Sequence, residues 1–375
     1  MFDIPSIRIG RLFGIPVEVN YSWFIIFALV TFSLSTAVFP EVEMAAGTSP
    51  LVFTIVSMVT ALLFFGSIVA HELSHALVAR AEGTDVGRIT LFIFGGVAQI
   101  DEEPSSPGRE FLMAAAGPGM SLLLAAVCTL GFTVTALWEY PWWVWAPLQY
   151  LAAINLMVGI FNLLPGFPLD GGRVLRSILW AVTGDLLKAT RWASRSGQVI
   201  GWLMVTVAVL GVSNGNTDMI WFGLVGWFIA SLAGQAYRQQ EIRARTEGVS
   251  VASIMTPSPV YVSGDLVLED LVHDHFIGGR HSRYPVLHDG AIVGVVSLSD
   301  VKRVDRAEWP HVRTIDVTDR DLAHLVVQGD TSVSTVLQRL AGERPGALIV
   351  VSDGRLAGIV TRADVISMLE HQVQS

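Results

Sequence analysis

The chain has 375 residues, of which 52% are hydrophobic and only 15% carry a charge. Soluble globular proteins average about 25% charged residues, so this composition excludes a protein that is soluble throughout. A net charge of −9 argues against a nucleic-acid partner, and a single cysteine, Cys128, excludes a disulfide framework and a thiolate metal site. Charged residues are scarce only in the first part of the chain, which predicts a membrane domain followed by a soluble one.

Apolar segments in the first part predict a multi-pass α-helical membrane protein with about six spans. The expected spans are residues 19–39, 51–80, 110–137, 147–164, 198–212 and 219–236. Residues 1–17 form a short cytoplasmic element before them, and residues 174–183 form a short amphipathic piece. We place the membrane domain at residues 1–237 and a polar linker at residues 238–248.

The second span ends in the pattern His-Glu-x-x-His, with His71, Glu72 and His75. Residues four apart lie on one helix face, so the two histidines can bind one metal ion together. Glu72 is then placed to take a proton from metal-bound water. A chance pentapeptide is the alternative, but Glu72 would then lie in or near lipid without a purpose. The pattern therefore predicts the core of a metal-dependent hydrolase.

Residues 81–109 are not a span. Residues 89–94 and 97–100 read as strands separated by Gly95-Gly96, which predicts a small membrane-associated β-hairpin. Non-helical backbone at membrane depth must be covered by protein or line a cavity. The hairpin is either an interfacial element without a further role or a strand edge that pairs with an extended substrate.

Prolines and glycines break the backbone after the fourth span, between residues 162 and 173. Asp170 lies on this irregular stretch, where a carboxylate from a distant segment can complete a two-histidine metal site. A helix-capping aspartate is the alternative. The absence of a third ligand near His71 and His75 favours the metal interpretation.

The basic residues predict the orientation of the spans. With the N-terminus inside, all thirteen lysines and arginines before residue 249 fall on or near the cytoplasmic side. This arrangement predicts a cell-membrane protein with cytoplasmic N- and C-termini. It also places His71, His75 and Asp170 toward the cytoplasmic half of the membrane.

Residues 249–375 contain an internal repeat, with one copy at 249–305 and another at 306–375. Each copy reads as strand, turn, strand and helix, which predicts an α/β module in the cytoplasm. Ser297 precedes Asp300 by three residues, as Thr361 precedes Asp364. These aspartates lie near helix starts, where they can cap the helix or accept a ribose hydroxyl. A self-associating regulatory module without a ligand is the alternative.

The membrane part resembles the site-2 proteases, which are intramembrane zinc metalloproteases. The resemblance rests on residues 71–75, 94–98, 116–118, 162–165 and 169–172 and extends over about residues 10–240. It implies one Zn²⁺ bound by His71, His75 and Asp170, with Glu72 as general base. Asn162 matches an asparagine that binds substrate or stabilises the oxyanion. Gly95, Gly96 and Val97 would lie in a substrate-binding hairpin near the site.

The C-terminal repeat resembles tandem cystathionine-β-synthase-type (CBS) domains, which fold together and commonly bind ATP, ADP or AMP. The first copy matches well, whereas the second lacks the Met-Thr start and the Pro-Val pair. The resemblance implies an adenine nucleotide site and a homodimer formed through these domains. Its candidate nucleotide-binding residues are Thr256, Ser297, Asp300, Thr361 and Asp364.

Together these features predict an intramembrane zinc metalloendopeptidase that performs regulated intramembrane proteolysis under control of the CBS pair. Its substrate would be a single-span membrane protein, such as an anti-sigma factor or a signal-peptide remnant. One alternative is a CBS-regulated transporter or channel, whose metal flux would not need Glu72. Another is an inactive relative that binds membrane proteins without cutting them, although Glu72 and all three candidate ligands are intact.

Overall fold

The structure is a computed structural model that describes residues 6–93, 95–100, 104–277, 283–341, 346–352 and 355–374. It forms two compact units, Met1–Arg238 and Gln239–Ser375. Two predictions lie partly outside the described residues. They are the end of the expected strand at Phe94 and the first five residues of the N-terminal element.

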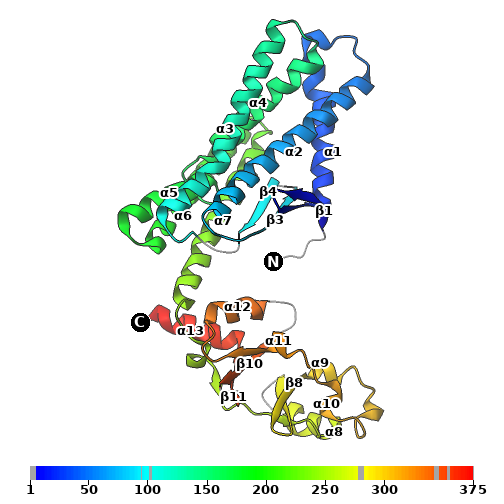
Figure 1. The fold of residues 1–375 in the computed structure, drawn as a ribbon, viewed down its shortest axis with the longest axis vertical. Helices are drawn as coiled ribbons and strands as arrows, with labels where there is room; N and C mark the ends of the chain where they lie inside the picture. Colours follow the sequence, from blue (N-terminus) through cyan, green and yellow to red (C-terminus); the bar gives the residue numbers. More distant parts are fainter. Residues whose placement is uncertain are drawn as a thin grey trace. The chain divides into compact units, whose positions relative to one another are not determined.

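Within the described residues of the first unit, six helices are long and apolar enough to cross a membrane. They are α1 (Tyr21–Ser33, continued in π- and 3₁₀-helical turns to Glu41), α2 (Pro50–Ala81), α3 (Pro107–Leu137), α4 (Trp142–Asn162), α6 (Leu186–Ser213) and α7 (Met219–Thr246). The amphipathic helix α5 (Asp170–Thr183) lies between α4 and α6 in the chain (Figure 1). The predicted six-span membrane fold is confirmed.

Several of these helices begin earlier than their apolar segments. The fourth begins at Trp142 rather than at residue 147, and α6 begins at Leu186 rather than at residue 198. Hydropathy marks the lipid-facing part of a helix, whereas backbone hydrogen bonding continues through polar turns. In α6 those turns carry Lys188, Arg191 and Arg195.

One four-stranded sheet, of order β1-β2-β3-β4, belongs to the first unit. Its strands are β1 (Ser6–Leu12), β2 (Ile15–Asn20), β3 (Val86–Phe92) and β4 (Gly95–Ile100). The predicted hairpin is β3–β4, but the N-terminal residues add a second hairpin that pairs in parallel with β3. The prediction of a first span from residue 19 was therefore wrong, because β2 continues to Asn20. The Asn20 side chain then caps α1 by accepting a hydrogen bond from the Ser22 amide at 2.8 Å.

The sheet lies against the second half of α2 (Figure 1). On one face of the sheet, Ile15 and Ile89 are buried against Ala76 of α2. A row of polar side chains joins all four strands. Ser6 donates to Glu18 at 2.7 Å, and Arg88 donates to both Glu18 and Gln99 at 3.2 Å. The pKa of Glu18 is lowered, mainly by the hydrogen bond from Ser6 and also by Arg88. These effects outweigh burial, which raises the pKa. This polar row fixes the register of β4, the strand nearest the candidate site.

The loop between α4 and α5 is docked onto α6. The Phe167 amide donates to the Ala193 carbonyl at 3.2 Å, and the Ser196 hydroxyl donates to the Pro165 carbonyl. A Cβ at Gly197 would lie 2.0 Å from the Phe167 carbonyl oxygen, so only glycine permits this approach. The loop therefore enters α5 from a fixed position, and Asp170 is the first residue of that helix.

The described part of the second unit forms two sheets, β5-β11-β10-β9 and β6-β7-β8. Their strands are β5 (Thr256–Pro257), β6 (Val262–Ser263), β7 (Arg283–His288), β8 (Ala291–Ser297), β9 (Val326–Gln328), β10 (Ala347–Ser352) and β11 (Arg355–Thr361). The predicted repeats are β7–β8–α9 and β10–β11–α13, with α9 at Leu298–Val301 and α13 at Arg362–Gln374. The described residues of this unit also form the short helices α8 (Leu268–Asp270), α10 (Thr314–Val317), α11 (Leu322–Leu325) and α12 (Val333–Ala341). Strand β5 of the first copy pairs with β11 of the second, so the two copies share a sheet.

Candidate metal centre

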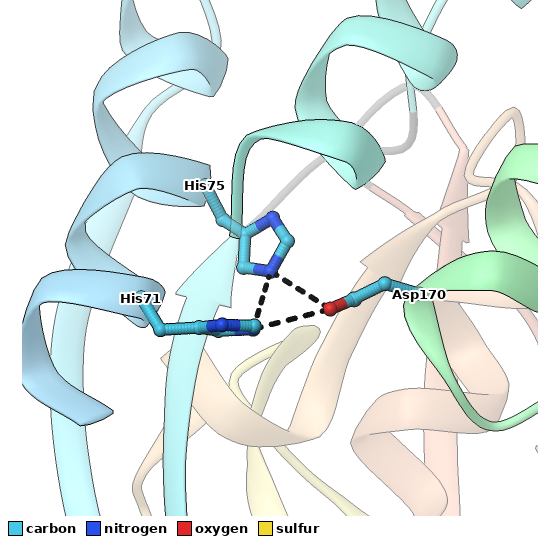
Figure 2. Close-up of side chains that lie close together, drawn as sticks. All are labelled: His71, His75 and Asp170. Atoms are coloured by element: carbon cyan, nitrogen blue, oxygen red, sulfur yellow. Dashed lines mark hydrogen bonds and ion pairs between the residues drawn. The ribbon is translucent and has the colours of Figure 1, made fainter. Parts of the chain in front are cut away.

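Three side chains from distant parts of the sequence converge inside the first unit (Figure 2). The Nε2 atoms of His71 and His75, one turn apart on α2, are 3.2 Å from each other. Asp170 Oδ2, at the start of α5, lies 3.1 Å from His71 Nε2 and 3.2 Å from His75 Nε2. Both histidines are 6% exposed. The residues predicted as ligands are thus brought together at one buried point.

The spacing of these three atoms fits a zinc ion. Zinc ligands lie about 2.0–2.1 Å from the metal, so the corners of a tetrahedral site are about 3.3 Å apart. The observed separations of 3.1–3.2 Å form a nearly equilateral triangle of that size. Two imidazole nitrogens and one carboxylate oxygen are also a donor set that zinc takes in catalytic sites, with a fourth position left for water or substrate.

The protonation of His75 supports the same fit. Its Nδ1 lies 2.6 Å from the Met113 carbonyl oxygen of α3. A carbonyl only accepts hydrogen bonds, so Nδ1 carries the proton and the Nε2 of the neutral ring presents a lone pair. That lone pair faces the oxygen of Asp170, and the contact is favourable only with a cation or a proton between the two atoms. His71 is held in a similar way, with Nδ1 2.9 Å from the Ser121 hydroxyl.

Gly117 leaves the space in front of the histidines open. A Cβ at this position would lie 2.1 Å from His75 Nε2 and 2.5 Å from His71 Nε2. Met113, Gly117 and Ser121 are spaced four apart and therefore share one face of α3. This face is not evident from the local sequence, because Ala116-Gly117-Pro118 alone indicates only close helix packing. The four-residue spacing was the signal that could have identified it.

Glu72, the predicted general base, lies between the metal cluster and the sheet. A Cβ at Gly96 of β4 would lie 2.6 Å from Glu72 Cγ, so this strand passes directly against the glutamate. The backbone N–H of Ala98, also on β4, interacts electrostatically with the Glu72 carboxylate. Gly95 has a φ of +129°, which favours glycine, and Val97 is 46% exposed. Of the predicted hairpin residues Gly95, Gly96 and Val97, the contacts thus place Gly96 beside Glu72.

Asn162 is the last residue of α4 and is half-buried. Its Nδ2 donates to the Val158 carbonyl one turn back, at 3.1 Å. The side chain is thus hydrogen-bonded within its own helix. Its contact with a substrate remains a prediction.

The candidate nucleotide residues lie in the second unit, where four of the five form capping contacts at helix starts. Asp300 Oδ2 accepts the Ser297 amide at 3.0 Å, and Asp364 Oδ2 accepts the Thr361 amide at 2.8 Å. Thr256 lies in β5. A cavity of about 390 Å³ in this unit has a different lining, formed by Ser258, Pro259, Tyr261, Leu287, Gly290, Ile292, Arg355 and Leu356. The nucleotide assignment of the five residues remains a prediction.

Comparison with known proteins covers both units. The profile described as "Peptidase family M50" matches residues 59–141 and 139–204, and that of the CBS domain matches residues 251–307 and 315–371. The chain is 36% identical to the Synechocystis protein named "Putative zinc metalloprotease sll0528" over 97% of this chain and 96% of that one. This chain belongs to peptidase family M50. The predicted membership in the site-2 proteases, with a tandem CBS module, is thereby confirmed, as is the predicted class of enzyme.

A curated protein and a solved structure, both from Methanocaldococcus jannaschii, are also similar to this M50 protein. Zinc metalloprotease MJ0392 is 31% identical over 96% of this chain and 95% of its own length. The solved structure titled "Site-2 Protease from Methanocaldococcus jannaschii" is 32% identical, covers 62% of this chain and 95% of its own, and superposes with a TM-score of 0.41.

Replacing Gly117 with alanine tests whether the space in front of the histidines is needed. The added methyl group would displace both imidazoles, so we expect Gly117→Ala to bind zinc at least about tenfold more weakly than wild type, as other changes that shift metal ligands do. Zinc affinity of the purified protein, measured by competition with a chelator, reports the effect. Gly119→Ala is the matched control, since its Cβ would meet nothing within 4 Å. Unchanged affinity in Gly117→Ala would contradict the geometry.

Proposed function

We propose that His71, His75 and Asp170 bind one zinc ion and that Glu72 uses it to hydrolyse peptide bonds in the transmembrane segments of membrane proteins. One observation carries this proposal. Three donor atoms lie 3.1–3.2 Å apart beside Glu72. Two of them, and Glu72 itself, come from α2, which is apolar and long enough to cross a membrane. A hydrolytic centre on such a helix meets substrates that are themselves in the membrane.

The bound ion would supply Lewis acidity, which polarises the scissile carbonyl and lowers the pKa of water toward 7. Glu72 accepts a proton from the attacking water and then delivers it to the leaving amine. His71, His75 and Asp170 would hold the ion through their lone pairs, and the Ala98 backbone N–H interacts electrostatically with the Glu72 carboxylate. Met113 and Ser121 keep the imidazole rings in the required orientation.

A transmembrane helix hides its carbonyl groups in its own hydrogen bonds, so the substrate must unwind near the cut. We propose that β4, with Gly95, Gly96 and Val97, receives the unwound segment by adding it as a further strand. Three facts support this role: β4 is at the end of the sheet order, it passes against Glu72, and Val97 is exposed. Asn162 would bind the substrate or stabilise the oxyanion.

We place the protein in the cell membrane with both termini in the cytoplasm. The support is the distribution of lysine and arginine, which the helix bounds leave on one side. His71 and His75 lie in the last third of α2 (Pro50–Ala81), which ends on that side, so water from the cytoplasm has a short path to the centre. The substrate class would be single-span proteins, including anti-sigma factors and signal-peptide remnants, in regulated intramembrane proteolysis.

The CBS pair would gate this activity by binding an adenine nucleotide, and it would also form a homodimer. Two features support gating. The shared sheet of β5 and β11 couples the two copies, and α7 connects them to the membrane domain. Helix α7, the last of the six candidate spans, runs from Met219 to Thr246, and the first copy begins at residue 249. Nucleotide-driven movement in the module would thus act on a membrane-spanning helix.

The central test compares wild type with Glu72→Gln on a single-span membrane substrate in liposomes, with zinc quantified. The variant keeps the three ligands but cannot accept a proton, so we expect retained zinc and cleavage lower by about 10²–10⁴-fold. Glu82→Gln, near the end of the same helix, is the matched control and should cut at the wild-type rate. Equal cleavage by Glu72→Gln would remove the mechanism. Zinc flux without cleavage in wild type would instead support the transporter alternative.

Deleting residues 249–375 tests the gate. We expect ATP or AMP to change the cleavage rate of the full chain by about 5–150-fold, the usual range of allosteric coupling, and to have no effect on the truncated chain. The measurement is initial cleavage rate with and without each nucleotide. Cleavage that is the same in both chains, with and without nucleotide, would contradict the gating proposal.

A further inference from the structure

A buried ion pair that the hydrolytic mechanism does not use links α3 to α5. Glu110 of α3 is fully buried and Arg176 of α5 is 6% exposed. Arg176 Nε donates to Glu110 Oε1 at 2.6 Å, and its Nη2 contacts the same oxygen. Ionisable groups buried among membrane-spanning helices are costly, so their presence usually serves a function.

Arg176 also contacts the loop that presents the third candidate ligand. Its guanidinium lies over the ring of Phe167, 5.2 Å from the ring centre. Phe167 is buried against Ala193 and Ala233 and precedes Asp170 by three residues. Arg176 itself follows Asp170 by six residues on the same short helix. One side chain thus holds the segments before and after Asp170 and anchors both to Glu110.

The same face of α3 holds the other two candidate ligands. Glu110 lies on this face with Met113, Gly117 and Ser121, since their spacing of three, four and four follows the helix repeat. Met113 accepts a hydrogen bond from His75, and Ser121 contacts His71. Helix α3 is therefore in contact with the elements that carry all three donors.

We propose that Glu110 and Arg176 are positioning residues that set Asp170 at bonding distance from the metal held by His71 and His75. This inference rests on the proposed zinc site. The guanidinium fork gives a direction as well as an attraction, so α5 cannot rotate or withdraw without breaking a buried charge pair. Apolar packing alone between α3 and α5 would permit the sliding that a third ligand cannot tolerate.

The experiment measures zinc affinity of the full chain by chelator competition in wild type, Glu110→Gln and Arg109→Met. Arg109 pairs with Glu82 at 2.7 Å one residue earlier on α3, but its side chain is 50% exposed, which makes it a matched control. We expect Glu110→Gln to bind zinc about 10–100-fold more weakly, as loss of groups that orient metal ligands usually does. Arg109→Met should bind like wild type.

A double-mutant cycle with Asp170→Ala separates positioning from general damage to the fold. If Glu110 acts through Asp170, adding Glu110→Gln to Asp170→Ala should change zinc affinity by no more than about twofold. A purely structural role would weaken binding in both backgrounds. The visible spectrum of the Co²⁺-substituted protein gives a second readout, because loss of the Asp170 oxygen alters the metal geometry in Glu110→Gln as it does in Asp170→Ala.

Arg176→Lys serves where Glu110→Gln does not fold, because it keeps both buried charges balanced. Lysine cannot reproduce the fork or the contact with the Phe167 ring, so a smaller loss of zinc affinity is expected. Wild-type affinity in Glu110→Gln or in Arg176→Lys would overturn the inference while leaving the zinc site intact. Equal losses with and without Asp170 would overturn it as well. Absence of zinc binding in wild type would instead overturn the proposed function on which the inference rests.

Discussion

The arrangement of the first unit depends on holding three lone pairs 3.1–3.2 Å apart inside a bundle of apolar helices. Such donors repel one another unless a cation lies between them, so the surrounding helices must hold the cluster open for the ion. Gly117 leaves the space, the Met113 carbonyl fixes the proton of His75, and the loop docked at Gly197 delivers Asp170. The small residues and buried polar groups around the centre have this common purpose.

The four-stranded sheet positions Glu72, as α3 and the loop before α5 position the three candidate ligands. A base beside a metal must be close to water and substrate, yet α2 could bury it among apolar side chains. Strand β4 places polar backbone beside it instead, because Gly96 lies against the Glu72 stem and the Ala98 N–H interacts electrostatically with its carboxylate. The polar row from Ser6 to Gln99 ties that strand to the N-terminal hairpin. Residues far from the chemistry in sequence thus set the position of the base.

Much of this was predictable from the sequence, because the strongest signals are local. His71 and His75 are one helical turn apart, and the apolar segments needed only length to be recognised. The strands of residues 6–20 were missed because a short hairpin with two arginines, Arg8 and Arg11, resembles a polar leader to a span. Glu110, Arg176 and Ser121 were missed for a different reason. Each is a polar residue within a helix, with no local signal that marks it. Its partner lies 50 or more residues away in the sequence, so only the packing of α3 against α2 and α5 reveals the contact.

X-ray absorption spectroscopy at the zinc edge of the purified full chain tests the central claim most directly. We predict one zinc per chain, bound by two imidazole nitrogens and by oxygen ligands at about 2.0–2.1 Å, with one oxygen lost in Asp170→Ala. A metal with a single imidazole, or a first shell unchanged by loss of Asp170, would contradict it. In either case the triangle formed by His71, His75 and Asp170 would not be the metal centre.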